Sequence, residues 1–261
     1  MKLFYVVGKE ASKSLSPTIF NYWFKKYKIS AKYDYLQLND KNFEKKIEET
    51  IKNRNIYGLN ITIPFKQKII KHLDVLDVHA KKINAVNCVS LGKKNIGINT
   101  DWEGYYKTLP RMKNFKKKKI VMFGYGGAAL AIHYVLINKG FRNIVIINRT
   151  KKKLNFLNNN KYTIKLDNTH KHLQSSDLII NTTPKNPINK KDISLIGKNV
   201  WLSDIVYKPK ETAFLKRFPN NKKIYGIAML LQQAVPCFKL WFGFKPQIDD
   251  DLLKILERKI R

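Results

Sequence analysis

The stretch "IVMFGYGGAALAIHYVL" at residues 120–136 decides the fold of this chain. It opens with an apolar run, turns at glycines and continues as an apolar helical segment, which predicts a buried strand, a tight turn and a helix. The turn, "GYGGAA" (124–129), fits the pattern G-x-G-x-x-G/A in the context that this pattern requires. Gly124 permits the tight turn, Gly126 lets a pyrophosphate approach the backbone, and Ala129 keeps the helix close to the strand. The helix N-terminus would then face the phosphates, whereas the alternative is an ordinary strand–helix turn of small residues.

The next strand ends in "INRTKKK" (147–153), about 25 residues after Gly124. An NAD-specific site has an Asp or Glu at this point, which binds the ribose hydroxyls. This chain has Asn148, Arg149 and Thr150 instead, and a guanidinium can bind a 2′-phosphate through two hydrogen bonds. We therefore expect NADP rather than NAD. The alternative is a solvated helix start, but lysines in a first helical turn oppose the helix dipole and so favour a bound anion.

Short β-branched runs alternate with amphipathic helical patterns along the chain, which is typical of an α/β protein. Ser16 is expected to cap the first helix, with Pro17 at its first position. The polar, basic stretch 110–119 is a candidate domain boundary. The pattern predicts strands at residues 3–8, 32–38, 56–62, 85–91, 95–100, 143–149, 162–166, 176–183 and 200–206, of which 85–91 and 95–100 would form a hairpin. It predicts helices at residues 16–29, 40–53, 226–243 and about 248–260, with two shorter helical segments between 62 and 85.

The formal net charge is +32, from 51 Lys and Arg against 19 Asp and Glu, which raises the hypothesis of a nucleic-acid-binding protein. The lysines are scattered over the whole chain among many asparagines and isoleucines, which favours a coding bias with solvated lysines. No basic helix, aromatic RNP-like strand or zinc motif accompanies the charge, so we expect no nucleic acid partner. A positive surface would still attract small anionic ligands.

The two cysteines, Cys88 and Cys237, fit neither a CxxC motif nor a disulfide framework, which favours a reducing compartment. The first apolar run is too short for a signal peptide, and no run of about 18 apolar residues could span a membrane. We expect a cytoplasmic protein with no membrane association and no metal site.

Lys66 ends the stretch "GLNITIPFK" (58–66), in which a strand-like run stops at Pro64. On local grounds it would be a solvated lysine or a residue that guards a strand edge. A dinucleotide-dependent oxidoreductase nevertheless needs a second site beside the nicotinamide, with a proton donor or acceptor for an alcohol or ketone.

Eight motifs together resemble the shikimate dehydrogenase family in their order and spacing, over nearly the whole chain. They are "KSLSP" (13–17), "GLNITIPFK" (58–66), "AVNCV" (85–89), "NTDWEG" (99–104), "GYGGAA" (124–129), "NRT" (148–150), "DIVYKP" (204–209) and "GIAMLLQQA" (226–234). The resemblance implies an NADP-dependent oxidoreductase that interconverts shikimate and 3-dehydroshikimate, on the route to chorismate and the aromatic amino acids.

The resemblance also implies a fold of two α/β domains. An N-terminal substrate-binding domain with a mostly parallel sheet would comprise residues 1–101 plus 235–261, and a Rossmann-like NADP-binding domain residues 102–234. The C-terminal helices would return to the first domain. Shikimate would bind between the domains, which would be expected to hinge.

The same resemblance assigns roles to single residues. Lys66 and Asp101 match the catalytic pair, and Ser14 and Ser16 the serines that hold the shikimate carboxylate, at a helix start that favours an anion. Read without the family, Ser16 is a helix cap. The other substrate-binding positions are Thr62, Asn87, Tyr207 and Gln233, which alone would be read as polar turn or helix residues. The cofactor-binding positions are Gly124, Tyr125, Gly126, Gly127, Ala128, Asn148, Arg149, Thr150, Lys153, Thr183, Ile205 and Gly226.

The implied chemistry explains why a lysine and a carboxylate are needed. When hydride leaves carbon 3 of shikimate, the hydroxyl must lose its proton, and in the reverse direction a developing alkoxide needs a positive neighbour. We expect Lys66 to stabilise this oxygen and exchange its proton while Asp101 positions the ammonium; which of the two formally takes the proton stays open. On local grounds, Thr100 to Glu103 reads as a capping box with Asp101 in the first turn.

The chain departs from the family pattern in three places. "GKEASKS" (8–14) lacks a proline before its serines, Phe20 stands where a histidine often precedes Asn21, and "NTTPKN" (181–186), which contains Thr183, replaces a threonine-then-glycine loop. The near alternatives are a quinate/shikimate dehydrogenase and the NADP-binding part of a glutamyl-tRNA reductase. The two serines of "SLSP" and the absence of an acid in "NRT" favour the narrower enzyme, as a monomer or homodimer, and a reductase gives no reason for the pair of Lys66 and Asp101.

Overall fold

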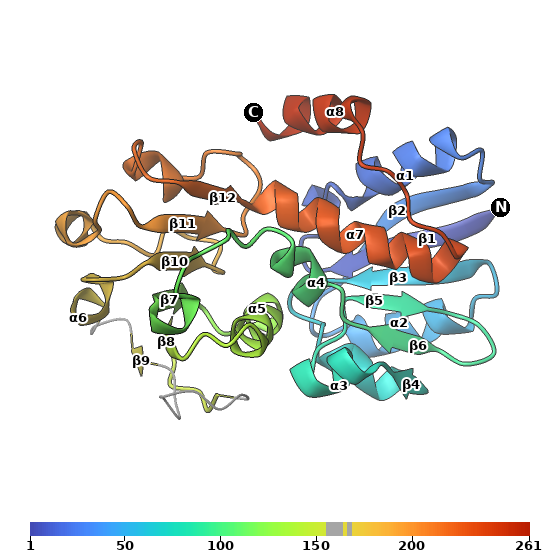
Figure 1. Cartoon of the computed structure of the whole chain (residues 1–261). Helices are drawn as coiled ribbons and strands as arrows, with labels where there is room; N and C mark the ends of the chain where they lie inside the picture. Colours follow the sequence, from blue (N-terminus) through green and yellow to red (C-terminus); the bar gives the residue numbers. More distant parts are fainter. Residues whose placement is uncertain (155–163, 166–168) are drawn as a thin grey trace. The chain divides into compact units, whose positions relative to one another are not determined.

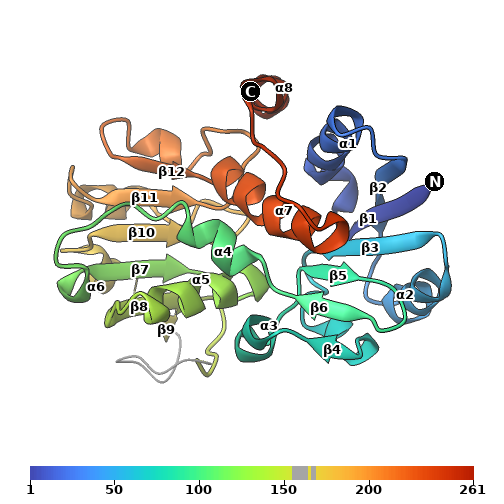
Figure 2. The ribbon, with the colours of Figure 1, turned by 45° about the vertical axis from the view of Figure 1, so that its right-hand side comes forward.

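The structure is a computed structural model, and it describes residues 1–154, 164–165 and 169–261. The chain forms two compact units, whose elements are labelled in Figures 1 and 2. The first unit holds Met1–Asp101 and Leu231–Arg258, and the second holds Trp102–Leu230 and Lys259–Arg261. These bounds differ from the predicted domains at residues 231–234 and 259–261, so Gln233 falls in the first unit.

A six-stranded sheet with the order β2-β1-β3-β5-β6-β4 forms the centre of the first unit. Its strands are β1 (Lys2–Gly8), β2 (Ala31–Gln37), β3 (Ile56–Ile61), β4 (Val75–Leu76), β5 (Cys88–Ser90) and β6 (Ile96–Ile98). Its helices are α1 (Ser16–Lys26), α2 (Phe43–Lys52), α3 (Val78–Ile83) and most of α7 (Gly226–Phe242) and α8 (Asp250–Ile260). β1 pairs in parallel with β2 and β3, and β4 with β6, whereas β5 is antiparallel to both of its neighbours.

Helices cover both faces of this sheet, because successive side chains of β1 point to opposite sides. Val7 packs with Phe43 of α2 in one core cluster. Phe4 points the other way, where its ring centroid lies 4.8 Å from that of Trp241 on α7. A Cβ added to Gly58 would lie 2.4 Å from Nε1 of Trp241. A glycine on β3 therefore lets α7 lie directly against the sheet, as both ribbon views show.

The second unit contains a fully parallel sheet with the order β12-β11-β10-β7-β8-β9. Numbered from one within the unit and read from the β9 edge, this is the order 3-2-1-4-5-6 of the doubly wound dinucleotide-binding fold. Its strands are β7 (Lys119–Phe123), β8 (Asn143–Asn148), β9 (Ile164–Lys165), β10 (Leu178–Asn181), β11 (Trp201–Asp204) and β12 (Lys223–Tyr225). Its helices are α4 (Asp101–Tyr106), except for Asp101 itself, which belongs to the first unit, α5 (Gly127–Asn138) and α6 (His170–Leu173). The strand order reverses between β7 and β10, which is where such folds bind their ligands.

The predicted α/β class is confirmed, and the differences in the elements have local causes. The first helix ends at Lys26 rather than near residue 29, since Lys28 has a positive φ of 54° that a helix cannot contain. The prediction lacks β4 and β12, because strands of two or three residues carry no readable periodicity. Of the strand predicted at 162–166, residues 164–165 form β9, and the others lie outside the described residues.

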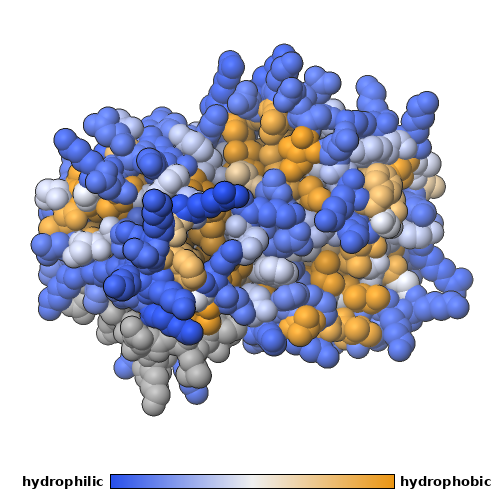
Figure 3. Space-filling view, in the orientation of Figure 1, coloured by the Kyte–Doolittle hydropathy of each residue, from blue (hydrophilic) through white to orange (hydrophobic). Residues whose placement is uncertain are grey.

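The surface reflects the composition. In Figure 3, hydrophilic residues cover most of the visible face and separate smaller apolar patches. In the part of the chain that the structure describes, no helix is both long and apolar enough to cross a membrane.

Candidate active site

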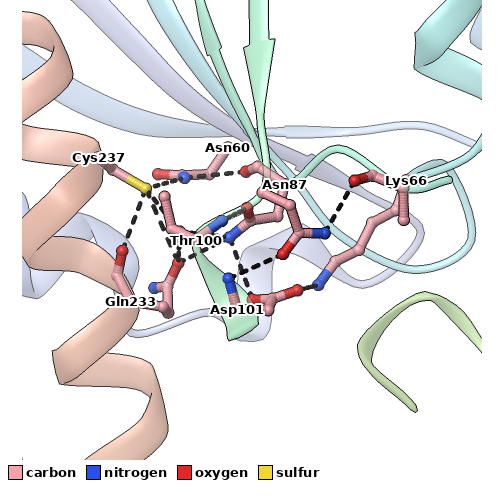
Figure 4. Close-up of polar contacts among 9 residues, drawn as sticks. Asn60, Lys66, Asn87, Thr100, Asp101, Gln233 and Cys237 are labelled. Carbon is pink, nitrogen blue, oxygen red and sulfur yellow. Dashed lines mark hydrogen bonds and ion pairs between the residues drawn. The ribbon is translucent and has the colours of Figure 1, made fainter. Parts of the chain in front are cut away.

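Lys66 and Asp101, which are 35 residues apart in the sequence, form a buried ion pair in the first unit (Figure 4). Nζ of Lys66 lies 2.5 Å from Oδ2 of Asp101, and the two side chains are 10% and 6% exposed. Lys66 lies in the turn after β3, and its carbonyl accepts a hydrogen bond from the amide of Val86 at 2.8 Å. Asp101 is the first residue of α4, where its own amide donates to Oδ1 of Asn99 at 3.1 Å. Both backbones are therefore fixed near the pair.

The Lys66 ammonium keeps unused hydrogen-bonding capacity. Asp101 is the only partner of Nζ within the described residues, although an ammonium has three N–H groups. Charges are rarely buried without a full set of partners, because burial removes their hydration. A buried ammonium with N–H groups to spare is thus suited to stabilise a partial negative charge on a ligand oxygen.

Asn87 supports the carboxylate of this pair. Its Oδ1 accepts the amide of Thr100 at 2.6 Å, which fixes the orientation of the side-chain amide and directs Nδ2 toward Asp101. Nδ2 lies 3.1 Å from Oδ1 of Asp101 and 3.0 Å from Oε1 of Gln233. Each carboxylate oxygen of Asp101 therefore has its own donor, Lys66 on Oδ2 and Asn87 on Oδ1.

A second layer of buried polar groups lies behind these residues (Figure 4). Nδ2 of Asn60 donates to the carbonyl of Asn87 at 3.0 Å, and Oδ1 of Asn60 accepts the hydroxyl of Tyr33 at 2.7 Å. Sγ of Cys237 lies 3.2 Å from Nδ2 of Asn60 and 3.2 Å from Oγ1 of Thr100. Sequence reasoning missed Asn60, Thr100 and Cys237. The amide of Asn60 between apolar neighbours of a buried strand was the signal that could have found this layer.

The Cys88 thiol adjoins this layer on β5. Burial, reinforced by the neighbouring thiol of Cys237, raises the pKa of Cys88 well above its ordinary value. It is therefore a protonated, weakly nucleophilic group.

The capping box expected at Thr100 is wrong. The hydroxyl of Thr100 contacts Asn87 at 2.8 Å and Cys237, and Glu103 pairs with Lys107 instead. The Thr100 hydroxyl therefore makes its contacts within the buried network instead of capping the helix.

Ser14, Ser16 and Thr62 lie in the first unit, but no hydrogen bond between described residues joins them to the pair of Lys66 and Asp101. The expectation that Ser16 caps the first helix is wrong, because α1 begins at Ser16 itself. Oγ of Ser14 accepts the amide of Ser16 at 3.1 Å, so Ser14 supports the helix start. Thr62 is half-buried, and its amide donates to the carbonyl of Val7 at 2.9 Å.

The glycine turn of the second unit has the shape that a dinucleotide phosphate requires. Gly124 has a positive φ of 95°, and a Cβ there would lie 2.4 Å from Oγ1 of Thr182. Gly126 is exposed, and an added Cβ would have nothing within 4 Å. α5 begins at Gly127, so its free amides open onto this space. Backbone donors beside open space at the strand-order reversal fit a bound dinucleotide.

Tyr125 and Lys152 add contacts around this turn that the sequence does not predict. The hydroxyl of Tyr125 lies 3.2 Å from Nδ1 of His133 on α5, and both side chains are buried. Burial lowers the pKa of His133 to about 4, so the imidazole is neutral near pH 7. Nζ of Lys152 lies 3.4 Å from the carbonyl oxygen of Tyr125. Lys152 is not among the predicted cofactor residues, whereas its neighbour Lys153 is, and that assignment stays a prediction.

The loop after β8 presents the other predicted cofactor residues. Arg149, Thr150 and Lys153 are exposed, and Nδ2 of Asn148 donates to the carbonyl of Thr150 at 2.8 Å. After β10, the hydroxyl of Thr183 lies 2.8 Å from Oδ1 of Asn181, within its own loop. Its neighbour Thr182 is the residue that donates to the carbonyl of Phe123, at 2.6 Å.

Three further predicted residues lie in the second unit. Gly226 directly follows β12, and Ile205 and Tyr207 follow β11. A Cβ added to Gly226 would lie 2.4 Å from the carbonyl oxygen of Ile205, so this position requires glycine on steric grounds. Ile205 and Tyr207 are half-buried. The described residues contain no group of three or more His, Cys, Asp or Glu arranged to hold a metal ion.

Comparisons with known proteins agree with this geometry. Residues 6–89 match the family model "Shikimate dehydrogenase substrate binding domain", and residues 108–203 match "Shikimate / quinate 5-dehydrogenase". The shikimate dehydrogenase (NADP(+)) of Pelagibacter ubique is 35% identical over an alignment of 267 positions, which covers 98% of this chain and 99% of that protein. That of Oceanobacillus iheyensis is 34% identical over an alignment of 252 positions, which covers 91% of this chain and 91% of that protein.

Two solved structures extend the likeness to the fold. The shikimate dehydrogenase of Aquifex aeolicus superposes with a TM-score of 0.84 at 30% identity, covering 100% of this chain and 98% of that one. A shikimate dehydrogenase in complex with NADP+ superposes with a TM-score of 0.82 at 29% identity, covering 100% of this chain and 94% of the other.

Proposed function

Because the chain belongs to the shikimate dehydrogenase family, we propose that it interconverts shikimate and 3-dehydroshikimate with NADP(H), using Lys66 and Asp101 as its catalytic pair. The family places this reaction on the route to chorismate and the aromatic amino acids. The observation that carries the residue assignment is the buried ammonium of Lys66, which is paired with Asp101 at 2.5 Å and retains N–H groups for a ligand oxygen.

The pair acts on the hydroxyl that becomes the ketone. As hydride adds to the ketone carbon, negative charge gathers on the oxygen, and the Lys66 ammonium would stabilise this charge. In ketone reduction the Lys66 ammonium gives a proton to this oxygen, and in hydroxyl oxidation the pair of Lys66 and Asp101, one proton short, takes that proton back, while Asp101 holds the Lys66 nitrogen in place. Asn87 holds Asp101 in turn, since its Nδ2 lies 3.1 Å from Oδ1 of that carboxylate.

NADP, when bound, supplies the acceptor or donor of the hydride. The turn at Gly124, Gly126 and Gly127 would hold its pyrophosphate, and Arg149 would bind the 2′-phosphate that distinguishes NADP from NAD. The other residues that we assign to the cofactor are Tyr125, Ala128, Asn148, Thr150, Lys153, Thr183, Ile205 and Gly226.

The substrate residues follow from the family likeness. We assign the shikimate carboxylate to Ser14 and Ser16, where the start of α1 offers backbone amides and the positive end of the helix dipole. Asn87 and Gln233 would bind ring hydroxyls, since the amide of Asn87 contacts Asp101 and that of Gln233 contacts Asn87. Thr62 and Tyr207 complete the set. The binding of shikimate between the two domains, the cytoplasmic location and a monomeric or homodimeric state stay predictions.

An activity matrix tests the function. Wild-type protein is mixed with shikimate or quinate and with NADP+ or NAD+, and formation of the reduced cofactor is followed by absorbance. We expect the highest kcat/KM with shikimate and NADP+. A rate with quinate equal to that with shikimate would favour the quinate/shikimate alternative, and no reaction in any combination would refute the proposal.

A further inference from the structure

The glycine turn between β7 and α5 has one side chain with which to hold its shape. Three of its four residues, 124–127, are glycines, and only Tyr125 carries a side chain. Glycine loses more backbone freedom on folding than any other residue, so ordering a turn of this composition is entropically unfavourable. Contacts with the surrounding structure therefore have to define its conformation.

Backbone hydrogen bonds anchor the two ends of this turn. On the strand side, the amide of Gly124 donates to the carbonyl of Ile147 at 2.8 Å. On the helix side, the amide of Leu130 donates to the carbonyl of Gly126 at 3.0 Å. Tyr125 lies between these two anchors, so its side chain is placed to hold the middle of the turn.

The side chain of Tyr125 is buried against α5. Its hydroxyl lies 3.2 Å from Nδ1 of His133, which is also buried, and the two ring centroids are 5.8 Å apart. His133 lies in the second turn of α5, so this contact joins the glycine turn to the body of the helix. Burial lowers the pKa of His133 to about 4, so the imidazole is neutral near pH 7. A neutral imidazole can share one hydrogen with the hydroxyl in either tautomer.

We propose that Tyr125 and His133 form a tether that holds the glycine turn in its phosphate-binding shape, with His133 as a positioning residue that acts through Tyr125. The inference rests on the proposed function, in which this turn binds the pyrophosphate of NADP. The space beside Gly126 is open, and the first amides of α5 face it only while the turn keeps its conformation.

Loss of the tether should weaken cofactor binding rather than slow the chemical step. Without it the turn populates other conformations, and the cofactor binds only the fraction of molecules in which the turn is in place. The loss of one neutral hydrogen bond predicts an increase of about three- to tenfold in the Kd of NADP+. The Kd of NAD+ should rise by the same factor, because both cofactors contain the pyrophosphate. The KM for shikimate, and kcat at saturating NADP+, should stay within a factor of about two.

The first test compares Tyr125→Phe with Tyr105→Phe by calorimetric titration of NADP+ and of NAD+. Each substitution removes the hydroxyl of a buried tyrosine and one contact of 3.2 Å, to His133 in the first case and to Ser203 on β11 in the second. All four residues belong to the second unit. We expect higher Kd values in Tyr125→Phe and wild-type values in Tyr105→Phe.

The second test compares His133→Leu with His133→Asn. The two replacements have nearly the same size and shape, but Asn places a polar atom where Nδ1 of the imidazole lies, and Leu places a methyl group there. Leu should raise both Kd values as Tyr125→Phe does, and Asn should restore most of the affinity. Because both changes break one contact, Tyr125→Phe with His133→Leu should raise Kd by less than the product of the single effects.

Hydrogen–deuterium exchange of the cofactor-free protein reports on the turn itself. Amides of residues 124–129 should exchange faster in Tyr125→Phe and His133→Leu than in the wild type and Tyr105→Phe. The two pairs of variants are independent, so either one decides the question if a variant of the other does not fold. Unchanged Kd values in Tyr125→Phe and His133→Leu, or an equal rise in the matched partner of each, would overturn the inference. A wild-type protein that binds neither cofactor would instead refute the proposed function, and the exchange rates would still test the tether.

Discussion

At the scale of single residues, two lysines near the end of β3 differ only in their surroundings. Lys66 is buried against Asp101, whereas Lys68, two residues later, pairs with Asp40 at 2.5 Å with its side chain 44% exposed. The charge and the type of partner are the same in both pairs. Burial is what separates a group that can act on a ligand from one that is solvated.

This contrast provides a matched test. Lys66→Met should lower kcat by about 10²- to 10⁴-fold, because it removes both the positive charge and the exchangeable proton. Lys68→Met should leave kcat within a factor of about two, since exposed ion pairs contribute little. The measurement is the rate of NADPH formation at saturating shikimate, with circular dichroism to establish folding. Similar rates in the two variants would exclude a catalytic role for Lys66.

Arg149 and Lys152 should differ in cofactor selectivity. Arg149→Ala should weaken the binding of NADP+ by about tenfold or more and that of NAD+ little, because NAD+ lacks the 2′-phosphate. Lys152 contacts the glycine turn, which would hold the pyrophosphate common to both cofactors. Lys152→Ala should therefore weaken the binding of NADP+ and of NAD+ by a similar, few-fold factor. Titration of each cofactor by fluorescence or calorimetry measures the four Kd values, and equal losses for Arg149→Ala would place the 2′-phosphate elsewhere.

The sequence predicted some residues of this site and missed others. Taken alone, Lys66 reads as a solvated lysine, and only the family resemblance connects it with Asp101. Asn60, Thr100 and Cys237 escaped prediction, because their roles depend on contacts between segments up to 177 residues apart. Local patterns carry no information about which distant polar groups will share one buried space.

At the scale of elements, α5 combines the helix start of the cofactor turn with a buried histidine. The folded-state pKa of His133 is about 4, compared with 6.5 for the unfolded chain. The native state thus keeps the imidazole neutral while the unfolded state binds a proton below pH 6.5. Stability from this group is present in full above pH 6.5 and is lost as the pH falls toward 4.

A His133→Gln variant isolates this contribution. The wild type should lose up to about 1.4 kcal/mol of unfolding free energy per pH unit more than the variant between pH 6.5 and 4. Urea unfolding at several pH values measures both curves. Parallel curves would mean that His133 is protonated in the folded state as readily as in the unfolded one.

The elements themselves were largely readable from the sequence. The strand, turn and helix of residues 120–136 appear as β7, the glycine turn and α5, because burial, glycine conformation and helical periodicity all act locally there. The start of α1 was less readable. Ser14 and Ser16 both precede Pro17 closely, and only the backbone conformation decides that Ser14 contacts the amide of Ser16.

At the scale of the whole molecule, the net charge of +32 on 261 residues should dominate the response to salt. Positive groups repel one another in the folded state more than in the expanded unfolded chain. Raising NaCl from about 10 to 300 mM, which shortens the Debye length from about 30 Å to below 8 Å, should therefore raise Tm. The same salt should raise the KM for NADP+, since screening weakens attraction of the phosphates.

Differential scanning calorimetry and initial rates over one salt series provide both quantities. A Tm independent of salt would mean that ion pairs already balance the positive charge. Tight binding to unrelated DNA that weakens steeply with salt and survives Lys66→Met would instead favour the nucleic-acid alternative.

The two-unit organisation has a consequence for dividing the gene. The first unit is discontinuous: it stops at Asp101 and resumes at Leu231, and the returning piece supplies both Gln233 and the Trp241 ring that packs on Phe4. A chimera that takes only residues 1–101 from a relative would keep the original residues 231–258. The exchanged part of the first unit would then lack the Trp241 ring and the Gln233 amide of its own sequence. A functional chimera therefore has to take residues 231–258 from the same relative as residues 1–101.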